Sequence, residues 1–223
     1  MAQIIVTARI VCASPSAREK VLAAFHKIIE FTYPNEPDVL RYVVTLPLDD
    51  TTGTVLYMIE EYASSAANDA HVATAPVQDL IQLFTTGNVL AQPPEVHICP
   101  VVGHKTSAKV SRIEANPAIV LAHVVYKPDT LSHALKGWRK VVEYVESNEY
   151  WTQGYTLGKE EESNCVRTVE VYESWGFVDK VHAGSEAVRE NAKENGKDRT
   201  GIEGTVRVRA VDGFMGRENL VKL

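Results

Sequence analysis

A repeat inside the chain is the feature that most constrains its fold. The stretch "FHKIIEFTYPNEPDVLRY" at 25–42 returns as "WRKVVEYVESNEYWTQGY" at 138–155, at an offset of 113 residues. Aromatic residues match aromatic ones, as Phe25 matches Trp138, apolar residues match apolar ones, and both glutamates recur. Similarity over this length predicts two copies of one structural unit.

Composition places the chain among globular proteins and excludes several functions. Of its 223 residues, 45% are hydrophobic and 23% charged, and the net charge of -6 argues against a nucleic-acid partner. No run approaches the roughly 18 apolar residues of a membrane span, and the N-terminus does not resemble a signal peptide. The few cysteines, which lie far apart, indicate a reducing, cytoplasmic location without a disulfide framework: Cys12, Cys99 and Cys165.

Hydrophobic periodicity predicts the order βαββαβ in the first copy. Apolar residues spaced three and four apart, among them Val21, Phe25 and Ile28, indicate a helix that Pro34 ends. A second helix is expected with an interruption near Pro76. The expected elements are a strand at 3–11, a helix at 17–33, strands at 39–47 and 54–62, a helix at 64–84 and a strand at 95–102.

The second copy repeats this order with small length changes in turns and at helix starts. We expect a domain over 1–102, a polar linker over 103–117 and a second domain over 118–223. The elements expected in the second domain are a strand at 118–126, a helix at 130–147, a hairpin of 150–158 with 165–173, one helix at 175–195 and a strand at 204–213.

The pattern of apolar residues also indicates what covers each sheet. Two helices cover only one face of a βαββαβ sheet, yet "IIV" and "YVV" carry apolar side chains toward both faces. Such a sheet needs a second sheet against it, which the other copy can supply. The predicted fold class is therefore α+β, with two ferredoxin-like βαββαβ repeats forming an intramolecular dimeric α/β barrel.

Two phrases of the first copy resemble the antibiotic biosynthesis monooxygenase (ABM) family of dimeric α/β barrels. They are "EPDVLRY" at 36–42 and "EEYASSAANDAH" at 60–71, with Asp38 where the family usually has glycine. In the second copy, Tyr150 replaces the family's proline. The resemblance implies a cofactor-independent monooxygenase that acts on a small aromatic, phenolic or quinol substrate of polyketide type, in secondary metabolism. Fold alone does not settle function.

Matched polar residues are the candidates for catalysis. His71 and His182 follow the hairpins, and an imidazole there could take a proton from a phenol. Tyr62 and Tyr172 end a strand, where a phenol could bind a substrate oxygen. Glu60 lies two residues before Tyr62 and so shares its face, as Glu170 does with Tyr172; a carboxylate in an apolar pocket could serve as a base. The alternative for the histidines is a helix residue hydrogen-bonded to a neighbouring carbonyl. The alternative for the tyrosines is an aromatic packed at the sheet edge, and for the glutamates it is a charged strand residue that faces solvent or an arginine.

Four further residues are candidates for substrate binding. His123 lies on an apolar strand face, where a satisfied core histidine is the alternative reading. Trp151 and Trp175 lack aromatic counterparts in the first copy, so they could stack on a flat substrate or fill a gap. Tyr57 matches Thr168 and marks another difference between the copies.

No cofactor is expected, because the chain lacks nucleotide-binding glycine motifs and metal-ligand spacing. Haem is one alternative, although Thr7, Ala8 and Tyr62 stand near the places where haem-degrading relatives use Asn and Trp. The other is a non-catalytic barrel that binds a small apolar ligand. The expected partner is a small hydrophobic or aromatic molecule, with no membrane partner, and a homodimer of the two-domain chain stays open.

Overall fold

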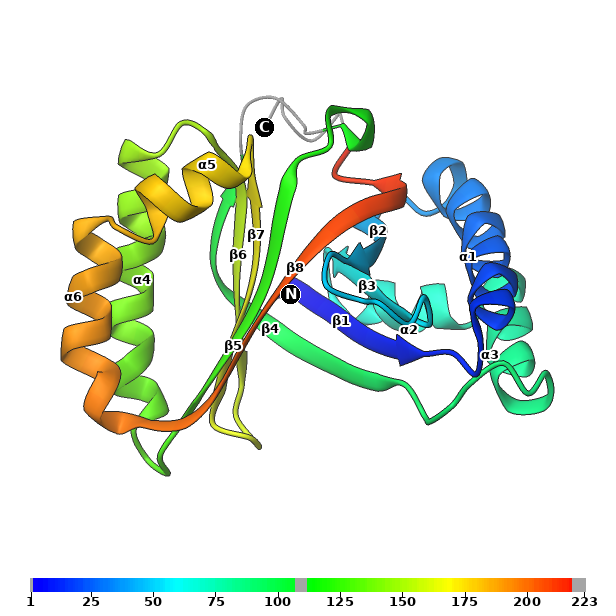
Figure 1. Ribbon diagram of the computed structural model, residues 1–223, viewed down its shortest axis with the longest axis horizontal. Helices are drawn as coiled ribbons and strands as arrows, with labels where there is room; N and C mark the ends of the chain where they lie inside the picture. Colours follow the sequence, from blue (N-terminus) through cyan, green and yellow to red (C-terminus); the bar gives the residue numbers. More distant parts are fainter. Residues whose placement is uncertain (1, 107–111, 218–223) are drawn as a thin grey trace. The chain divides into compact units, whose positions relative to one another are not determined.

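The computed structural model describes residues 2–106 and 112–217, so residues 107–111 of the expected linker lie outside the described part. The chain divides into two compact units (Figure 1). The first unit comprises Met1–Ile98, Arg112–Asn116 and Val208–Leu223, and the second comprises Cys99–Ser111 and Pro117–Arg207.

The elements follow the predicted order. The first repeat contains β1 (Ile4–Val11), α1 (Pro15–Asn35), β2 (Val39–Pro47), β3 (Val55–Tyr62), α2 (Ser65–Val72), α3 (Ala75–Thr86) and β4 (Glu95–Thr106), and the short helix η1 (Ile113–Ala115) follows it. The second contains β5 (Ala118–Tyr126), α4 (Leu131–Asn148), β6 (Thr152–Glu160), β7 (Cys165–Tyr172), α5 (Trp175–Phe177), η2 (Val178–His182), α6 (Glu186–Asn195), η3 (Gly196–Asp198) and β8 (Arg199–Phe214).

Each repeat donates its last strand to the sheet of the other. In the first unit the strand order is β1-β3-β2-β8, and the β8 partners of β2 run from Val208 to Phe214. In the second unit it is β5-β7-β6-β4, and the β4 partners of β6 run from Val101 to Thr106. The full order, β1-β3-β2-β8-β5-β7-β6-β4, is that of a dimeric α/β barrel within one chain. The predicted α+β class with two ferredoxin-like repeats is confirmed.

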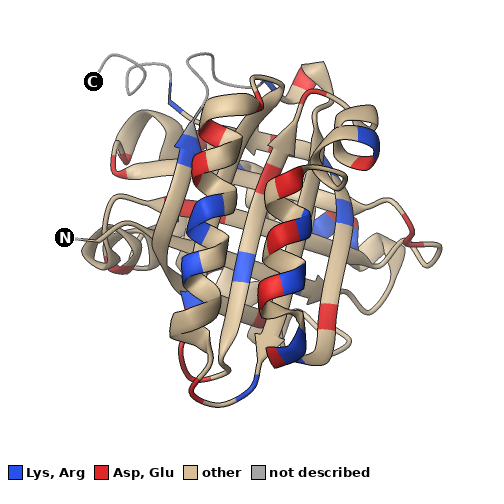
Figure 2. Cartoon of the chain, turned by 90° about the vertical axis from the view of Figure 1, so that its left-hand side faces the viewer, with Lys and Arg blue, Asp and Glu red and all other residues tan. Residues whose placement is uncertain are grey.

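Serine side chains cap α1, α2 and α6, and the helices pack through apolar faces. Ser14, Ser64 and Ser185 each accept a hydrogen bond from a backbone N–H in the first turn of the helix that follows. The stripe expected for α1 is buried, and Val21 and Ile28 are fully inaccessible to solvent. In the second unit, α4 and α6 lie side by side on one face of the sheet, and each carries charges of both signs (Figures 1 and 2).

A cation on an exchanged strand, or just beyond it, caps the C-terminus of the long helix in each unit. Lys105 donates to the carbonyl oxygens of Val145 and Glu149 at 2.8 and 2.5 Å. Arg217, shortly after β8, donates to the equivalent carbonyls of Thr32 and Glu36, at 3.2 and 2.5 Å. The carbonyls of Thr32 and Val145 also accept from the C-cap N–H groups, and the helix dipole favours positive charge at this end. The two cations therefore fix the helix ends that carry Glu36 and Glu149.

Three expectations about the elements need correction. Pro34 does not end α1 but lies inside its last turn, and the helix ends at Asn35, so the missing N–H and the clash with the preceding turn affect only the helix end. The single helix expected at 175–195 is wrong: the chain forms α5, a π-helical turn η2 and then α6. The outer strands are longer than their apolar cores suggested, since β4 runs to Thr106 and β8 starts at Arg199.

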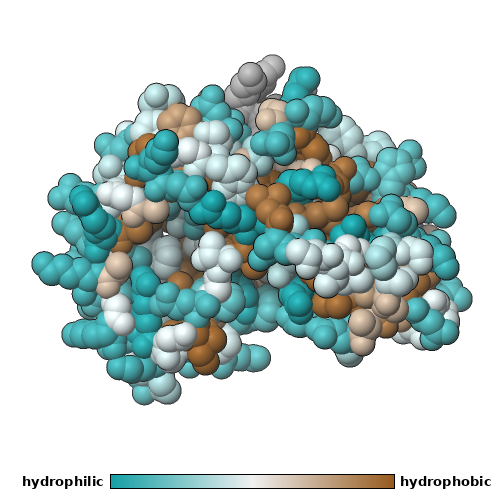
Figure 3. Space-filling view, in the orientation of Figure 1, coloured by the Kyte–Doolittle hydropathy of each residue, from teal (hydrophilic) through white to brown (hydrophobic). Residues whose placement is uncertain are grey.

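The core of each unit lies between its sheet and its helices. Apolar residues of β1, β2, β3 and α1 form the main cluster of the first unit, and residues of β5, β6, β7 and α4 form that of the second. Hydrophilic side chains cover most of the second unit on the face in Figure 3. Within the described residues, none of the helices is long and apolar enough to cross a membrane.

Candidate active site

A buried polar network lies between the sheet and the helices of the first unit. His71 on α2 places Nδ1 2.9 Å from a carboxylate oxygen of Glu36, which also accepts from Thr32 at 2.7 Å. Tyr62 donates to Glu60 at 2.6 Å, which confirms that these side chains share a face of β3. The rings of Tyr62 and His71 are 5.6 Å apart. His71, Glu60 and Tyr62 are 2%, 6% and 0% exposed.

The second unit builds the same network from the matched residues. Nδ1 of His182 lies 3.0 Å from the carboxylate of Glu149, which also accepts from Thr152 at 2.8 Å. Glu170 accepts from Tyr172 at 2.7 Å, and its carboxylate lies 4.0 Å from Nε2 of His182. Each imidazole is therefore held at Nδ1 by one glutamate, while a second glutamate lies nearby.

Two tyrosines complete the networks. Tyr42 on β2 lies 5.3 Å from the His71 ring, and Tyr155 on β6 lies 5.7 Å from the His182 ring, as measured between ring centroids. Both are buried. Burial and the charge of the nearby glutamate, Glu60 or Glu170, raise the pKa of both phenols, so they stay protonated and can donate hydrogen bonds.

Electrostatics favour a proton on these networks. Burial raises the pKa of Glu60 against the opposing effects of His71 and of the Tyr62 hydrogen bond. Burial disfavours a charge on His182, but the hydrogen bond to Glu149 and the negative charge of Glu170 outweigh it and raise the pKa of the imidazole. A proton taken up by His182 is therefore stabilised by two carboxylates.

The raised pKa of His182 predicts how stability depends on pH. The stabilisation from the protonated imidazole is fully present below the unfolded-state pKa of 6.5 and is lost as the pH rises through the higher folded-state pKa. We expect the free energy of unfolding to fall over this window in the wild type, and the slope to be shallower in His182→Gln. Urea unfolding at a series of pH values measures the difference, and parallel curves for the two proteins would contradict it.

The other predicted residues lie in different surroundings. Trp151 stacks on Phe177, with ring centroids 5.1 Å apart, and Trp175 has the guanidinium of Arg207 over its ring at 5.1 Å. Both tryptophans pack against a buried cluster that contains Tyr172, so they border the second network.

Tyr57 and His123 lie apart from the networks. By strand alternation, Tyr57 is on the face of β3 opposite Glu60, and His123 is on the face of β5 opposite Val120, the partner of Glu170. The ring of His123 lies against Gly204, where an added Cβ would be 2.2 Å from it. The structure does not bring these two residues to the matched site.

Glu36 and Glu149 are the partners that the sequence reasoning missed as site residues, together with Tyr42 and Tyr155. All four recur at matched positions of the repeat, so the signal was available. A carboxylate at the end of a helix, however, usually faces solvent. Here the chain turns back after α1 and α4, which buries Glu149 completely and leaves the Glu36 side chain 13% exposed.

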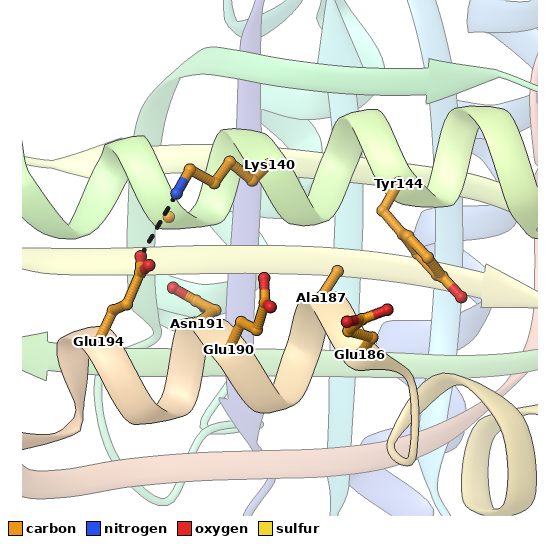
Figure 4. Close-up of a pocket in the computed structure, with 8 residues that line it drawn as sticks. Lys140, Tyr144, Glu186, Ala187, Glu190, Asn191 and Glu194 are labelled. Carbon is orange, nitrogen blue, oxygen red and sulfur yellow. Dashed lines mark ion pairs between the residues drawn. The ribbon is translucent and has the colours of Figure 1, made fainter.

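A separate cavity of about 220 Å³ lies between α4 and α6 in the second unit (Figure 4). Lys140 and Tyr144 of α4 face Glu186, Glu190 and Glu194 of α6 across it, and Lys140 pairs with Glu194 at 3.5 Å. It contains none of the predicted site residues. Within the described part of the chain, no group of three or more His, Cys, Asp or Glu side chains is arranged to hold a metal ion.

The duplicated network and the exchanged strands define a tandem α/β-barrel protein with one matched Glu–His–Glu–Tyr site per repeat. Residues 3–83 match the family model described as antibiotic biosynthesis monooxygenase. This match lies within the first repeat and confirms the resemblance inferred from the sequence there. A search of curated proteins found no match.

Solved structures show the same fold over the whole chain. An inferred monooxygenase of Lactobacillus acidophilus is 17% identical with a TM-score of 0.78, over 97% of this chain and 98% of that one. A second inferred monooxygenase, of Fusobacterium nucleatum, is 16% identical with a TM-score of 0.80, over 96% and 95%. An anthrone oxidase-like protein is 12% identical with a TM-score of 0.67, over 98% and 95%. At these identities the likeness concerns the fold.

Proposed function

We propose that this protein is a cofactor-independent monooxygenase-like enzyme that oxidises a small phenolic, anthrone or quinol substrate. The observation that carries the proposal is the buried carboxylate–histidine pair, built twice at matched positions. A carboxylate accepts hydrogen bonds only, so Nδ1 of each histidine carries a proton and Nε2 is the nitrogen that can accept one. This is the arrangement of a general base oriented by a carboxylate.

An anthrone illustrates how the residues would act. Nε2 of the histidine takes a proton from the ring CH₂ group, and a protonated tyrosine stabilises the enolate oxygen. The enolate passes one electron to O₂, the two radicals combine as a peroxide anion, and the protonated histidine returns its proton to give the hydroperoxide. Loss of water then forms the ketone, so one O₂ gives one quinone and one water. The chain's tasks are to hold the ring, accept the proton and exclude solvent.

The second candidate is a non-catalytic barrel that binds a small apolar ligand. It is favoured by the low exposure of the networks, in which the glutamates and His182 are satisfied largely by one another. In that case the networks serve stability alone. Haem binding is the less favoured alternative, because both histidines are buried and Nε2 of His182 faces the Glu170 carboxylate, 4.0 Å away.

Oxygen uptake separates these functions. Haem-free protein is mixed with 1,8-dihydroxyanthrone or a naphthohydroquinone in the presence of a chelator, and O₂ and quinone are followed together. We expect stoichiometric quinone formation whose rate rises with pH, and a loss of about 100-fold or more in the His71→Ala/His182→Ala double variant. His26→Ala, with a side chain 57% exposed, is the control.

Each remaining outcome has a defined meaning. Full turnover in the double variant would remove histidine from the mechanism. The lack of uptake by the wild type would favour the binding protein, and a Soret shift on titration with haemin would favour haem binding.

A further inference from the structure

The two networks match, but their borders do not. In the second repeat, Trp151 stacks nearly parallel on Phe177, at 9°, and Tyr150 meets Trp151 edge-on with centroids 4.6 Å apart. At the equivalent places the first repeat has Asp38 and Pro37, at the same offset of 113 residues. The stacked aromatic border of the second network therefore has no counterpart at the equivalent positions of the first repeat, where Tyr33 and Phe214 meet edge-on instead.

This aromatic border is continuous with the polar network of the second repeat. Trp151 and Trp175 pack against the buried cluster of Ala118, Val120, Tyr172 and Val178. Tyr172 donates to Glu170, and its ring lies 5.2 Å from that of His182. A flat molecule held at the tryptophans would thus lie next to the histidine and its carboxylates.

Two donors beside the second network are buried without a hydrogen-bond partner. They are the indole nitrogen of Trp151 and the hydroxyl of Tyr155, which is 0% exposed. The Tyr155 hydroxyl lies near Glu170 but does not reach bonding geometry. In the first network, within the described part, no buried side-chain nitrogen or oxygen lacks a partner. An unpartnered buried donor is costly and indicates a missing acceptor.

The backbone at the histidine also differs between the repeats. His71 lies within the regular helix α2, whereas His182 ends the π-helical turn η2 (Val178–His182). Such turns are rare and occur frequently at functional sites. The aromatic border, the two unpartnered donors and the π turn are separate observations, and each distinguishes the second network from the first.

We propose that the second repeat holds the working site, and that its ligand is a flat fused-ring aromatic with an acceptor oxygen, such as a hydroxyquinone or hydroxyanthrone. The ring lies against Trp151 and its neighbours, and its oxygen accepts from the Tyr155 hydroxyl or the Trp151 indole. In the first repeat the network has a structural role only. This inference rests on the proposed function for the identity of the reaction, but its test requires binding only.

The test compares matched variants of the full chain with 2-hydroxy-1,4-naphthoquinone as the probe, measured by equilibrium dialysis. We expect one probe bound per chain. Tyr155→Phe and Trp151→Phe should each weaken binding about 3- to 10-fold, because each removes one hydrogen bond. Tyr42→Phe, the matched change in the first repeat, should leave the affinity within about twofold. Thermal unfolding should show Tyr155→Phe no less stable than the wild type, since its hydroxyl lacks a partner.

Binding and turnover can fail separately. Two probes per chain, equal weakening by Tyr42→Phe and Tyr155→Phe, or the lack of binding would each overturn the assignment to the second repeat. If the expected binding pattern is found while oxygen uptake is absent, the binding site in the second repeat is supported and the proposed oxygenase activity is contradicted.

Discussion

Replacing Gly213 with alanine will lower the free energy of unfolding by about 3 kcal/mol or more. Gly213 lies in β8 opposite Val43 of β2, with φ of 114°, a conformation that L-residues rarely adopt. A Cβ there would lie 2.0 Å from the carbonyl oxygen of Tyr42, a backbone atom that cannot rotate away. The backbone strain of an L-residue at this φ and the clash with the carbonyl oxygen both lower the stability of the variant. Urea or thermal unfolding measures the loss.

Gly201 provides the matched control. It also lies in β8 and has a positive φ of 81°, but nothing lies within 4 Å of an added Cβ. Gly201→Ala should therefore cost about 1 kcal/mol, the strain alone. Equal effects of the two substitutions would show that β8 does not approach β2 as described, and the exchange of strands would lose its support.

Replacing Glu149 with alanine will lower the free energy of unfolding by about 3–5 kcal/mol near neutral pH. The carboxylate is buried and accepts hydrogen bonds from His182 and Thr152. Its removal leaves the imidazole with a single carboxylate neighbour, that of Glu170, 4.0 Å away. Because a buried charge without close partners is costly, the loss should diminish at high pH, where His182 is neutral.

Two variants test this interpretation. Glu143→Ala, on the same helix and exposed, should change the free energy of unfolding by less than about 0.5 kcal/mol. Glu149→Gln keeps an acceptor and the shape of the side chain, so it should lie between the other two. A cost below about 1 kcal/mol for Glu149→Ala would mean that the Glu–His pair does not stabilise the second unit.

The sequence was sufficient for the repeat, the strands and half of each network. Alternation along β3 placed Glu60 and Tyr62 on one face, and the repeat pointed to His71 and His182, because these signals are local or duplicated. The exchange of β4 and β8 was not predictable in this way. The apolar sequence of a strand indicates that it needs a neighbouring strand, but it does not indicate which sheet supplies that strand.

Other features depend on tertiary contacts. Glu149 becomes the hydrogen-bond partner of His182 only because the chain folds back after α4. Lys105, on a strand distant in the sequence, fixes that helix end. The π turn of η2 adds one residue to a helical turn, and nothing in the pattern of "VDKVH" marks it. The one extra residue between Tyr172 and His182, relative to the first repeat, is its visible trace.

Proton NMR of the imidazole Nδ1–H groups tests the central claim most directly, namely that each repeat buries a histidine whose Nδ1–H is held by a glutamate. We predict two slowly exchanging, downfield signals, one removed by Glu36→Ala and the other by Glu149→Ala. If both protons exchange with water within the dead time in the folded wild type, the networks do not form as described, and the proposed catalytic role of the histidines fails with them.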